Sequence, residues 1–86
     1  MSRNLIRLKF IFLDGNTHEI TCFREAKIST IKDIVSEITG KSTNEFELIG
    51  ERKSGGRVGL FPYNRLLSRL GIEDGDTITV ARVTFE

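Results

Sequence analysis

Apolar side chains recur with the period of an α-helix in one stretch of the chain, residues 30–40. The spacing i, i+3, i+7 defines an apolar stripe, made by Ile31, Ile34 and Ile38 with Val35 beside it. The opposite face carries the polar residues Lys32, Asp33, Ser36 and Glu37. Thr30 suits the residue that caps the start of a helix, and Gly40 suits the left-handed residue that ends one. The pattern predicts one short helix, whose stripe must be buried because a few turns alone are marginal in water.

Elsewhere the apolar positions alternate with polar ones, which is the period of β-strands. The alternation predicts strands over residues 5–13, 17–23, 46–49, 58–61 and 77–85. In the first of these, Leu8, Phe10 and Phe12 fall on one side, and Arg7, Lys9 and Ile11 fall on the other. A short turn or 3₁₀ segment is expected around residues 66–72. Because the first and last strands are the longest, we expect them to pair in parallel at the centre of the sheet.

These elements predict the α+β class, as a roll in which a mixed four- to five-stranded sheet packs on one helix. Eighty-six residues are enough for one hydrophobic core, so residues 1–86 are expected to form a single domain. No apolar run reaches membrane-spanning length, and no signal sequence is recognised. We therefore expect a cytoplasmic protein without membrane insertion.

Charge is nearly balanced, with thirteen basic and twelve acidic residues and a formal net charge of +1. This balance argues against a dedicated nucleic-acid-binding protein, which normally carries a clear basic excess. Positive charge is nevertheless concentrated in residues 50–70, in a basic cluster made by Arg52, Lys53, Arg57, Arg65 and Arg69. Such a cluster is either a solvated rim or a surface that accepts an acidic partner segment or, less readily, phosphate groups.

No combination of residues indicates catalysis, a metal site or a cofactor. Cys22 is the single cysteine, so neither an internal disulfide nor a cysteine zinc site is possible, and we expect it to be a small buried hydrophobe. The glycine-rich stretch 54–59 lacks the Gly-Lys-Ser/Thr sequence and the following helix of a phosphate loop. The acidic turn 73–76 offers too few oxygen ligands for calcium. We therefore expect a protein that is not an enzyme and has no cofactor.

The order of these elements and two motifs resemble the ubiquitin-like β-grasp family. The stretch LSRLGIEDGDTITV at 67–80 is similar to the end of that family's sequences, and residues 30–38 match its helix in the same register. The chain further resembles YukD/EsaB-like bacterial proteins associated with type VII secretion, through the stretches FREAKISTIKDIV and NRLLSRLGIEDGDTITV. It also has some similarity to the small ubiquitin-like subunit of toluene monooxygenases, through residues 59–62. Both groups are non-catalytic partners within larger assemblies.

The resemblance implies a protein-interaction module that is not conjugated to other proteins. Conjugated modifiers end in a flexible Gly-Gly tail, whereas residues 83–86 read Val-Thr-Phe-Glu. Ubiquitin-like domains commonly bind through the sheet face turned away from the helix, where this chain is expected to present Arg7, Lys9, Ile11, Ile49 and Ala81. The basic cluster would then add orientation and association rate. Binding of nucleic acid or another anion through the basic cluster remains the alternative, and the partner protein and oligomeric state stay open.

Overall fold

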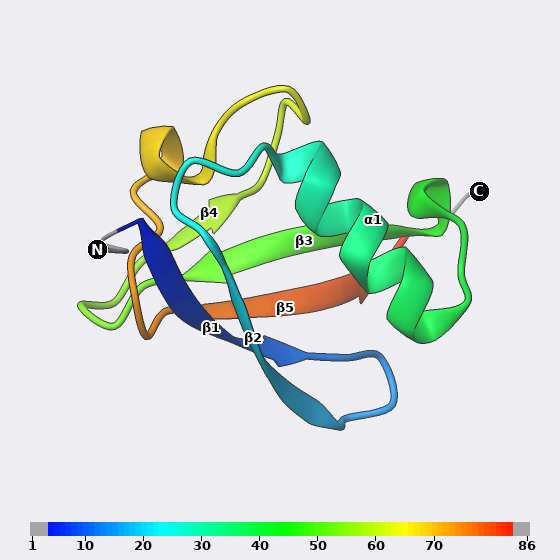
Figure 1. Cartoon of the computed structure of the whole chain (residues 1–86). Helices are drawn as coiled ribbons and strands as arrows, with labels where there is room; N and C mark the ends of the chain where they lie inside the picture. The colour runs from blue at the N-terminus through cyan, green and yellow to red at the C-terminus, as the bar shows by residue number, and fades with distance from the viewer. Residues whose placement is uncertain (1–3, 84–86) are drawn as a thin grey trace.

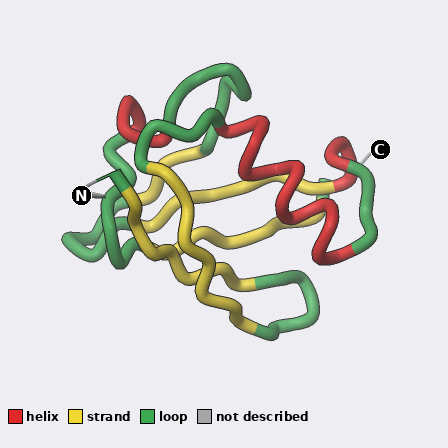
Figure 2. The backbone as a smooth tube through the Cα atoms, in the orientation of Figure 1, coloured by secondary structure: helices red, strands yellow, loops and turns green. Residues whose placement is uncertain are grey.

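The computed structural model of the chain describes residues 4–83. Its elements follow in the order β1 (Leu5–Ile11), β2 (Thr17–Phe23), α1 (Ile28–Thr39), η1 (Thr43–Glu45), β3 (Phe46–Glu51), β4 (Arg57–Gly59), η2 (Leu67–Leu70) and β5 (Thr77–Arg82). Figure 1 shows α1 lying across one face of the sheet, and Figure 2 separates the strand layer from the helix. The structure is the predicted α+β roll.

The five strands form one sheet in the order β2-β1-β5-β3-β4. The neighbours β1 and β5 run parallel, with Lys9 opposite Thr77 and Ile11 opposite Thr79. The other neighbouring pairs are antiparallel. The sheet is therefore mixed, and the predicted pairing of the first and last strands is confirmed.

Strand ends differ from the predictions by a few residues. β1 ends at Ile11 instead of residue 13, because the turn to β2 has already begun there. β3 continues to Glu51, since both β4 and β5 pair with it up to that residue. β4 ends at Gly59, where the Phe61 N–H group turns back to the Gly59 carbonyl. β5 ends at Arg82, and the predicted continuation to residues 84 and 85 lies outside the described residues.

The hydrophobic core lies between the sheet and α1. One side of each long strand points into it, and the buried strand residues include Ile6, Leu8, Phe10, Cys22, Phe46, Leu48, Ile78 and Val80. Leu60, Leu67 and Ile72 close the core on the side of η2. The alternation seen in the sequence therefore identifies the buried face of each long strand correctly.

The helix differs from its prediction at both ends of the stripe. Its buried apolar residues are Ile28, Ile31 and Val35, whereas Ile38 is 48% exposed, so its predicted burial is wrong. Ile28 and Val35 lie at the middle of the buried face of the helix. Ile38 therefore lies at the flank of that face, in the last turn. Gly40 adopts the predicted left-handed conformation, with φ of 75°.

The start of the helix is also two residues earlier than predicted, so Thr30 is not its cap. Lys27 precedes the first turn and makes no side-chain capping bond. Instead, the Ile28 N–H group donates to the Arg65 carbonyl at 2.9 Å, and the Ser29 N–H group donates to the Tyr63 carbonyl at 2.8 Å. Distant backbone groups thus satisfy donors that a capping side chain would otherwise satisfy. Within residues 4–83, no helix has the length and apolar character needed to cross a membrane.

Candidate protein-docking face

The sheet has one face turned away from α1, which we call the outer face. Because side chains alternate along a strand, the odd-numbered residues of all five strands point to it. They include all five expected docking residues, Arg7, Lys9, Ile11, Ile49 and Ala81. The sequence prediction of which residues share this face is consistent with the geometry of the sheet.

The strand register brings two apolar residues of the outer face, Ile11 and Ile49, into one row. Ile11 on β1 is opposite Thr79 on β5, and Thr79 is opposite Ile49 on β3. The next row begins with Ala81, which is opposite Glu47. Ile11, Ile49 and Ala81 are each half-buried, so part of every side chain remains in contact with solvent. These three residues form a small apolar centre that spans the three middle strands.

An apolar groove continues this centre toward the margin of the sheet. Its volume is about 510 Å³, and it is lined by Glu47, Leu48, Ile49, Gly59, Phe61, Pro62 and Tyr63. The Phe61 ring lies against Gly59, where a larger residue would collide with it, and the side chain is 63% exposed. Large exposed aromatic side chains beside a groove are typical of binding surfaces. The sequence does not indicate this groove, because the loop after β4 has no periodic pattern.

Two ion pairs flank the apolar centre. Arg7 Nη1 lies 3.9 Å from Glu19 Oε1, and Arg57 Nε lies 3.2 Å from Glu51 Oε2. Their arginine side chains are about two-thirds exposed, so these pairs contribute little to stability. Charges at the rim of a docking surface instead favour the correct orientation of a partner.

The basic cluster does not form one continuous feature with the outer face. Arg57 lies on that face, but Arg52 covers Gly71 and donates from Nη2 to the Leu70 carbonyl at 2.9 Å. The Lys53 N–H group donates to Asp76 Oδ1 at 3.0 Å, which ties the loop after β3 to the turn before β5. The exposed remainder of the cluster is Arg65 and Arg69. At least two of its members therefore hold loops together.

A cleft of about 390 Å³ beside Arg52 and Lys53 is lined by acidic groups as well. Glu73 and Asp76 lie in its wall, and Asp76 is buried and accepts bonds from two backbone N–H groups. The two acidic side chains balance the two basic ones. The cleft therefore lacks the positive excess that a phosphate-binding site would need.

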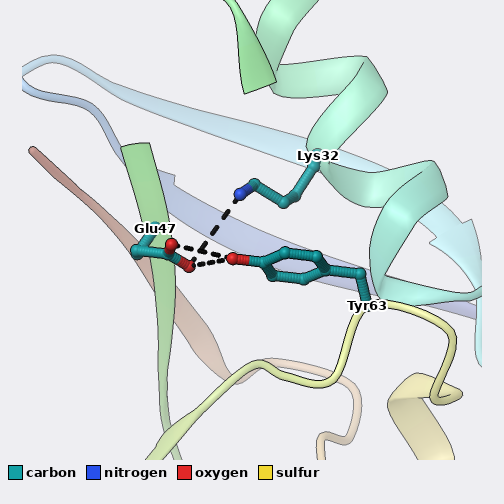
Figure 3. Close-up of polar contacts among 3 residues, drawn as sticks. All are labelled: Lys32, Glu47 and Tyr63. Atoms are coloured by element: carbon teal, nitrogen blue, oxygen red, sulfur yellow. Dashed lines mark hydrogen bonds and ion pairs between the residues drawn. The ribbon is translucent and has the colours of Figure 1, made fainter. Parts of the chain in front are cut away.

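A polar cluster made by Lys32, Glu47 and Tyr63 lies at the side of β3 and joins it to α1 (Figure 3). The Tyr63 hydroxyl donates to the Glu47 carboxylate, with both oxygens at 2.7 Å. Lys32 Nζ lies 3.8 Å from Glu47 Oε1 and 4.1 Å from the centre of the Tyr63 ring. Lys32 is only 4% exposed, so its predicted place on the solvated face of the helix is wrong.

Aromatic contacts explain why a lysine is tolerated there. The Lys32 ammonium group also lies 5.2 Å from the centre of the Phe46 ring, and aromatic faces attract cations. The hydrogen bond to Glu47 raises the pKa of the Tyr63 hydroxyl, and burial and the negative charge of Glu47 act in the same direction. The only signal in the sequence is weak: long lysine stems sometimes lie along apolar surfaces.

The residues that could serve as metal ligands or nucleophiles lie apart from one another in the described part of the chain. Between residues 4 and 83, no three His, Cys, Asp or Glu side chains are close enough to hold a metal ion. Cys22 is buried as predicted, and burial raises the pKa of its thiol. The His18 ring packs edge-on against Phe12, with the ring centres 4.8 Å apart.

Comparisons with known proteins show which fold this is. No family model matches the chain, and no curated protein sequence matches it. The C-terminal ubiquitin-like domain of mouse tubulin-specific chaperone e is 18% identical, with a TM-score of 0.85 over 100% of this chain and 95% of that chain. A ubiquitin-like domain from Arabidopsis thaliana is 19% identical, with a TM-score of 0.81 over 98% of this chain and 83% of that one.

A designed protein based on ubiquitin is similar as well. It is 15% identical, and its TM-score is 0.79 over 99% of this chain and 96% of its own. At such low identities, a likeness in structure establishes the fold and leaves function to be argued from the site. The chain has the ubiquitin-like β-grasp fold.

Proposed function

We propose that the chain is a non-catalytic protein-interaction module, and that its outer face is the docking surface. The observation that carries this proposal is the apolar centre around Ile11 and Ile49, which continues into the groove beside Phe61. Half-buried aliphatic side chains, an exposed aromatic ring and a charged rim match the composition of protein–protein interfaces.

Two features favour docking over catalysis. The thiol of Cys22 is the strongest nucleophile in the chain, but it is buried and its pKa is raised, so little thiolate forms near neutral pH. His18 contacts an aromatic ring and has no described partner that would orient it as a base. Neither Cys22 nor His18 is therefore arranged for nucleophilic or acid–base chemistry in the part of the chain that the structure describes.

Binding of nucleic acid is the weaker candidate. It would require the basic cluster to act as one patch, whereas the Arg52 guanidinium donates to the Leu70 carbonyl and Arg57 pairs with Glu51. Single-stranded nucleic acid also requires aromatic platforms beside the positive charge. The groove and the apolar centre match the apolar core of a protein–protein interface better than they match a nucleic-acid-binding surface.

We further propose that the chain works in the cytoplasm, without conjugation, as an accessory component of a larger assembly. The resemblance to YukD/EsaB-like proteins favours a type VII secretion system over a multicomponent monooxygenase. Identification of the partner protein discriminates between the two assemblies. A type VII secretion system predicts a secretion ATPase as partner, and a multicomponent monooxygenase predicts oxygenase subunits. Formation of a C-terminal adenylate on incubation with a cognate activating enzyme would contradict the absence of conjugation.

Capture from a cell extract of the source organism tests the docking face. Wild type and two variants, Ile49→Glu and Ile38→Glu, are used as bait, and bound proteins are identified by mass spectrometry. Both variants place the same charge at an incompletely buried isoleucine, but Ile38 lies on α1, away from the outer face. We expect the specific partner to be lost with Ile49→Glu alone. Equal capture by all three baits would contradict the proposal.

A further inference from the structure

We propose that the free edge of β2 pairs with the same edge of a second copy of this chain, which joins the two sheets into one. β2 is the outermost strand of the sheet, with β1 as its single neighbour among the described strands (Figure 1). This surface is distinct from the outer face. The inference is therefore independent of the partner protein proposed above.

The hydrogen-bonding pattern shows which backbone groups of β2 are free. The Phe12 N–H group donates to the Asn16 carbonyl at 2.8 Å, and the Arg24 N–H group donates to the Asn4 carbonyl. These bonds at the two ends show that even-numbered residues direct their backbone groups toward β1. Because the direction alternates in an antiparallel ladder, the odd-numbered residues direct theirs away from the sheet.

The pairing of β1 with β5 confirms this assignment from the other side. The Lys9 N–H group donates to the Asp76 carbonyl at 3.1 Å, and the Arg7 carbonyl accepts from the Gly75 N–H group at 2.8 Å. Odd residues of β1 therefore face β5, and its even residues face β2. In the part of the chain that the structure describes, the outward N–H groups of Thr17, Glu19, Thr21 and Phe23 have no hydrogen-bond acceptor.

Proteins usually protect such an edge, and the protection on β2 is limited to the charged side chain of Glu19, which pairs with Arg7 of β1. A bulge, a proline, an inward charge or a very short strand keeps an edge from pairing with another chain. The other edge strand, β4, has three residues and is followed closely by Pro62. β2 has seven residues, THEITCF, without proline, glycine or lysine, and its threonines, isoleucine and phenylalanine favour strands. β2 is therefore the less protected of the two edges.

The sequence of β2 is complementary to itself in one antiparallel register. A two-fold axis at Ile20 places Glu19 opposite Thr21 of the second copy and Thr17 opposite Phe23 of the second copy. The odd residues then face each other, and because the Phe23 carbonyl already accepts from the Ala26 N–H group, about six ladder hydrogen bonds can form. No like charges lie directly opposite, and the pairing would cover Phe23, which is 62% exposed. A register centred on Glu19 would instead set two glutamates against each other.

This choice of register makes a charge test possible. Thr21→Lys places a lysine opposite Glu19 of the second copy twice per dimer, and Thr21→Glu places a glutamate there. Opposite-charge cross-strand pairs should strengthen the dimer about 2- to 30-fold, and like charges should weaken it by a similar factor. Thr77→Lys on the central strand β5 is the matched control, because it adds the same charge to the same face away from the edge.

These effects are measured by sedimentation equilibrium of the full chain from about 10 µM to about 1 mM. The range extends to high concentration because a strand edge buries less area than the ~800 Å² per partner of a standard interface, so the dimer is expected to be weak. Amide hydrogen exchange gives an independent readout. The odd amides of β2 should become protected as concentration rises, whereas its even amides are protected at every concentration. Ile49→Glu should leave the dimer unchanged, so loss of partner capture and loss of the dimer are distinguishable.

Three results would overturn the inference. The first is a wild-type chain that stays monomeric at 1 mM and whose odd amides in β2 exchange rapidly. The edge would then be available to pair with an extended segment of another protein instead. The second is a dimer that responds equally to the substitutions at residues 21 and 77. The third is a dimer in which protection appears outside β2.

Discussion

Tyr63 and Glu47 hold the loop after β4 against the edge of β3 through a hydrogen bond of 2.7 Å from the tyrosine hydroxyl to the carboxylate. Tyr63 also accepts the Ser29 N–H group on its carbonyl, so one residue connects the loop, β3 and the start of α1. Both side chains line the apolar groove of the candidate docking face. The stability of this contact is therefore linked to the shape of the groove.

Replacement of Tyr63 by phenylalanine should remove the hydrogen bond and keep the ring over Lys32. Because the site is partly exposed, we expect the free energy of unfolding to fall by about 0.5–1.5 kcal/mol, measured by urea denaturation. An unchanged unfolding midpoint would show that the hydrogen bond contributes nothing in solution.

The same pair should make stability depend on alkaline pH. The pKa of Tyr63 is raised in the folded chain, so folding favours its neutral form. This contribution is complete below the ordinary tyrosine pKa of about 10 and is lost as pH rises through the raised value. The stability difference between wild type and Tyr63→Phe should therefore shrink above pH 10. Titration by ultraviolet absorbance checks the direction of the pKa shift, and a lowered value would contradict it.

Lys32 should matter more for its stem than for its charge. Lys32→Met keeps most of the volume against Phe46 and Tyr63, and the Glu47 carboxylate that loses its partner is 45% exposed and still accepts the Tyr63 hydroxyl bond. We expect a change within about 1 kcal/mol for Lys32→Met and a loss of about 1.5–3 kcal/mol for Lys32→Ala, measured by chemical denaturation. Equal losses in the two variants would show that the ammonium group, and not packing, accounts for the contribution.

Gly50 in β3 has no room for a side chain. A Cβ atom there would lie 2.6 Å from Ile72 Cδ1 and 3.2 Å from Val58 Cγ1. Since Ile72 is buried in the core, Gly50→Ala should cost about 1–3 kcal/mol through overpacking. The double variant Gly50→Ala with Ile72→Val removes the clashing methyl and should recover part of the loss in a thermal or urea melt. Equal or lower stability of the double variant would place the strain elsewhere.

Most of the fold was predictable from the sequence, because alternation along the strands reports directly on which face is buried. Phe10 and Leu48 are buried as the pattern predicts, and Gly40 ends the helix as expected. The errors lie where distant contacts decide. The backbone carbonyls of residues 63 and 65 set the start of α1, and no local signal indicates them.

The candidate site was predictable only in part. Period-two reasoning placed Ile11 and Ile49 on one face, but their position on either side of Thr79 depends on the strand order. The groove beside Phe61 and the burial of Lys32 depend on how an irregular loop returns to the sheet. Such a loop has no repeating pattern from which its path could be read.

The central claim is that the outer face docks a protein, and the direct measurement is a map of amide chemical shifts in the labelled chain as the captured partner is added. We predict that the changes gather on Ile11, Ile49, Thr79 and Ala81 and on the groove beside Phe61. Changes confined to α1 or to the exposed arginines of the basic cluster, with these residues unmoved, would contradict it.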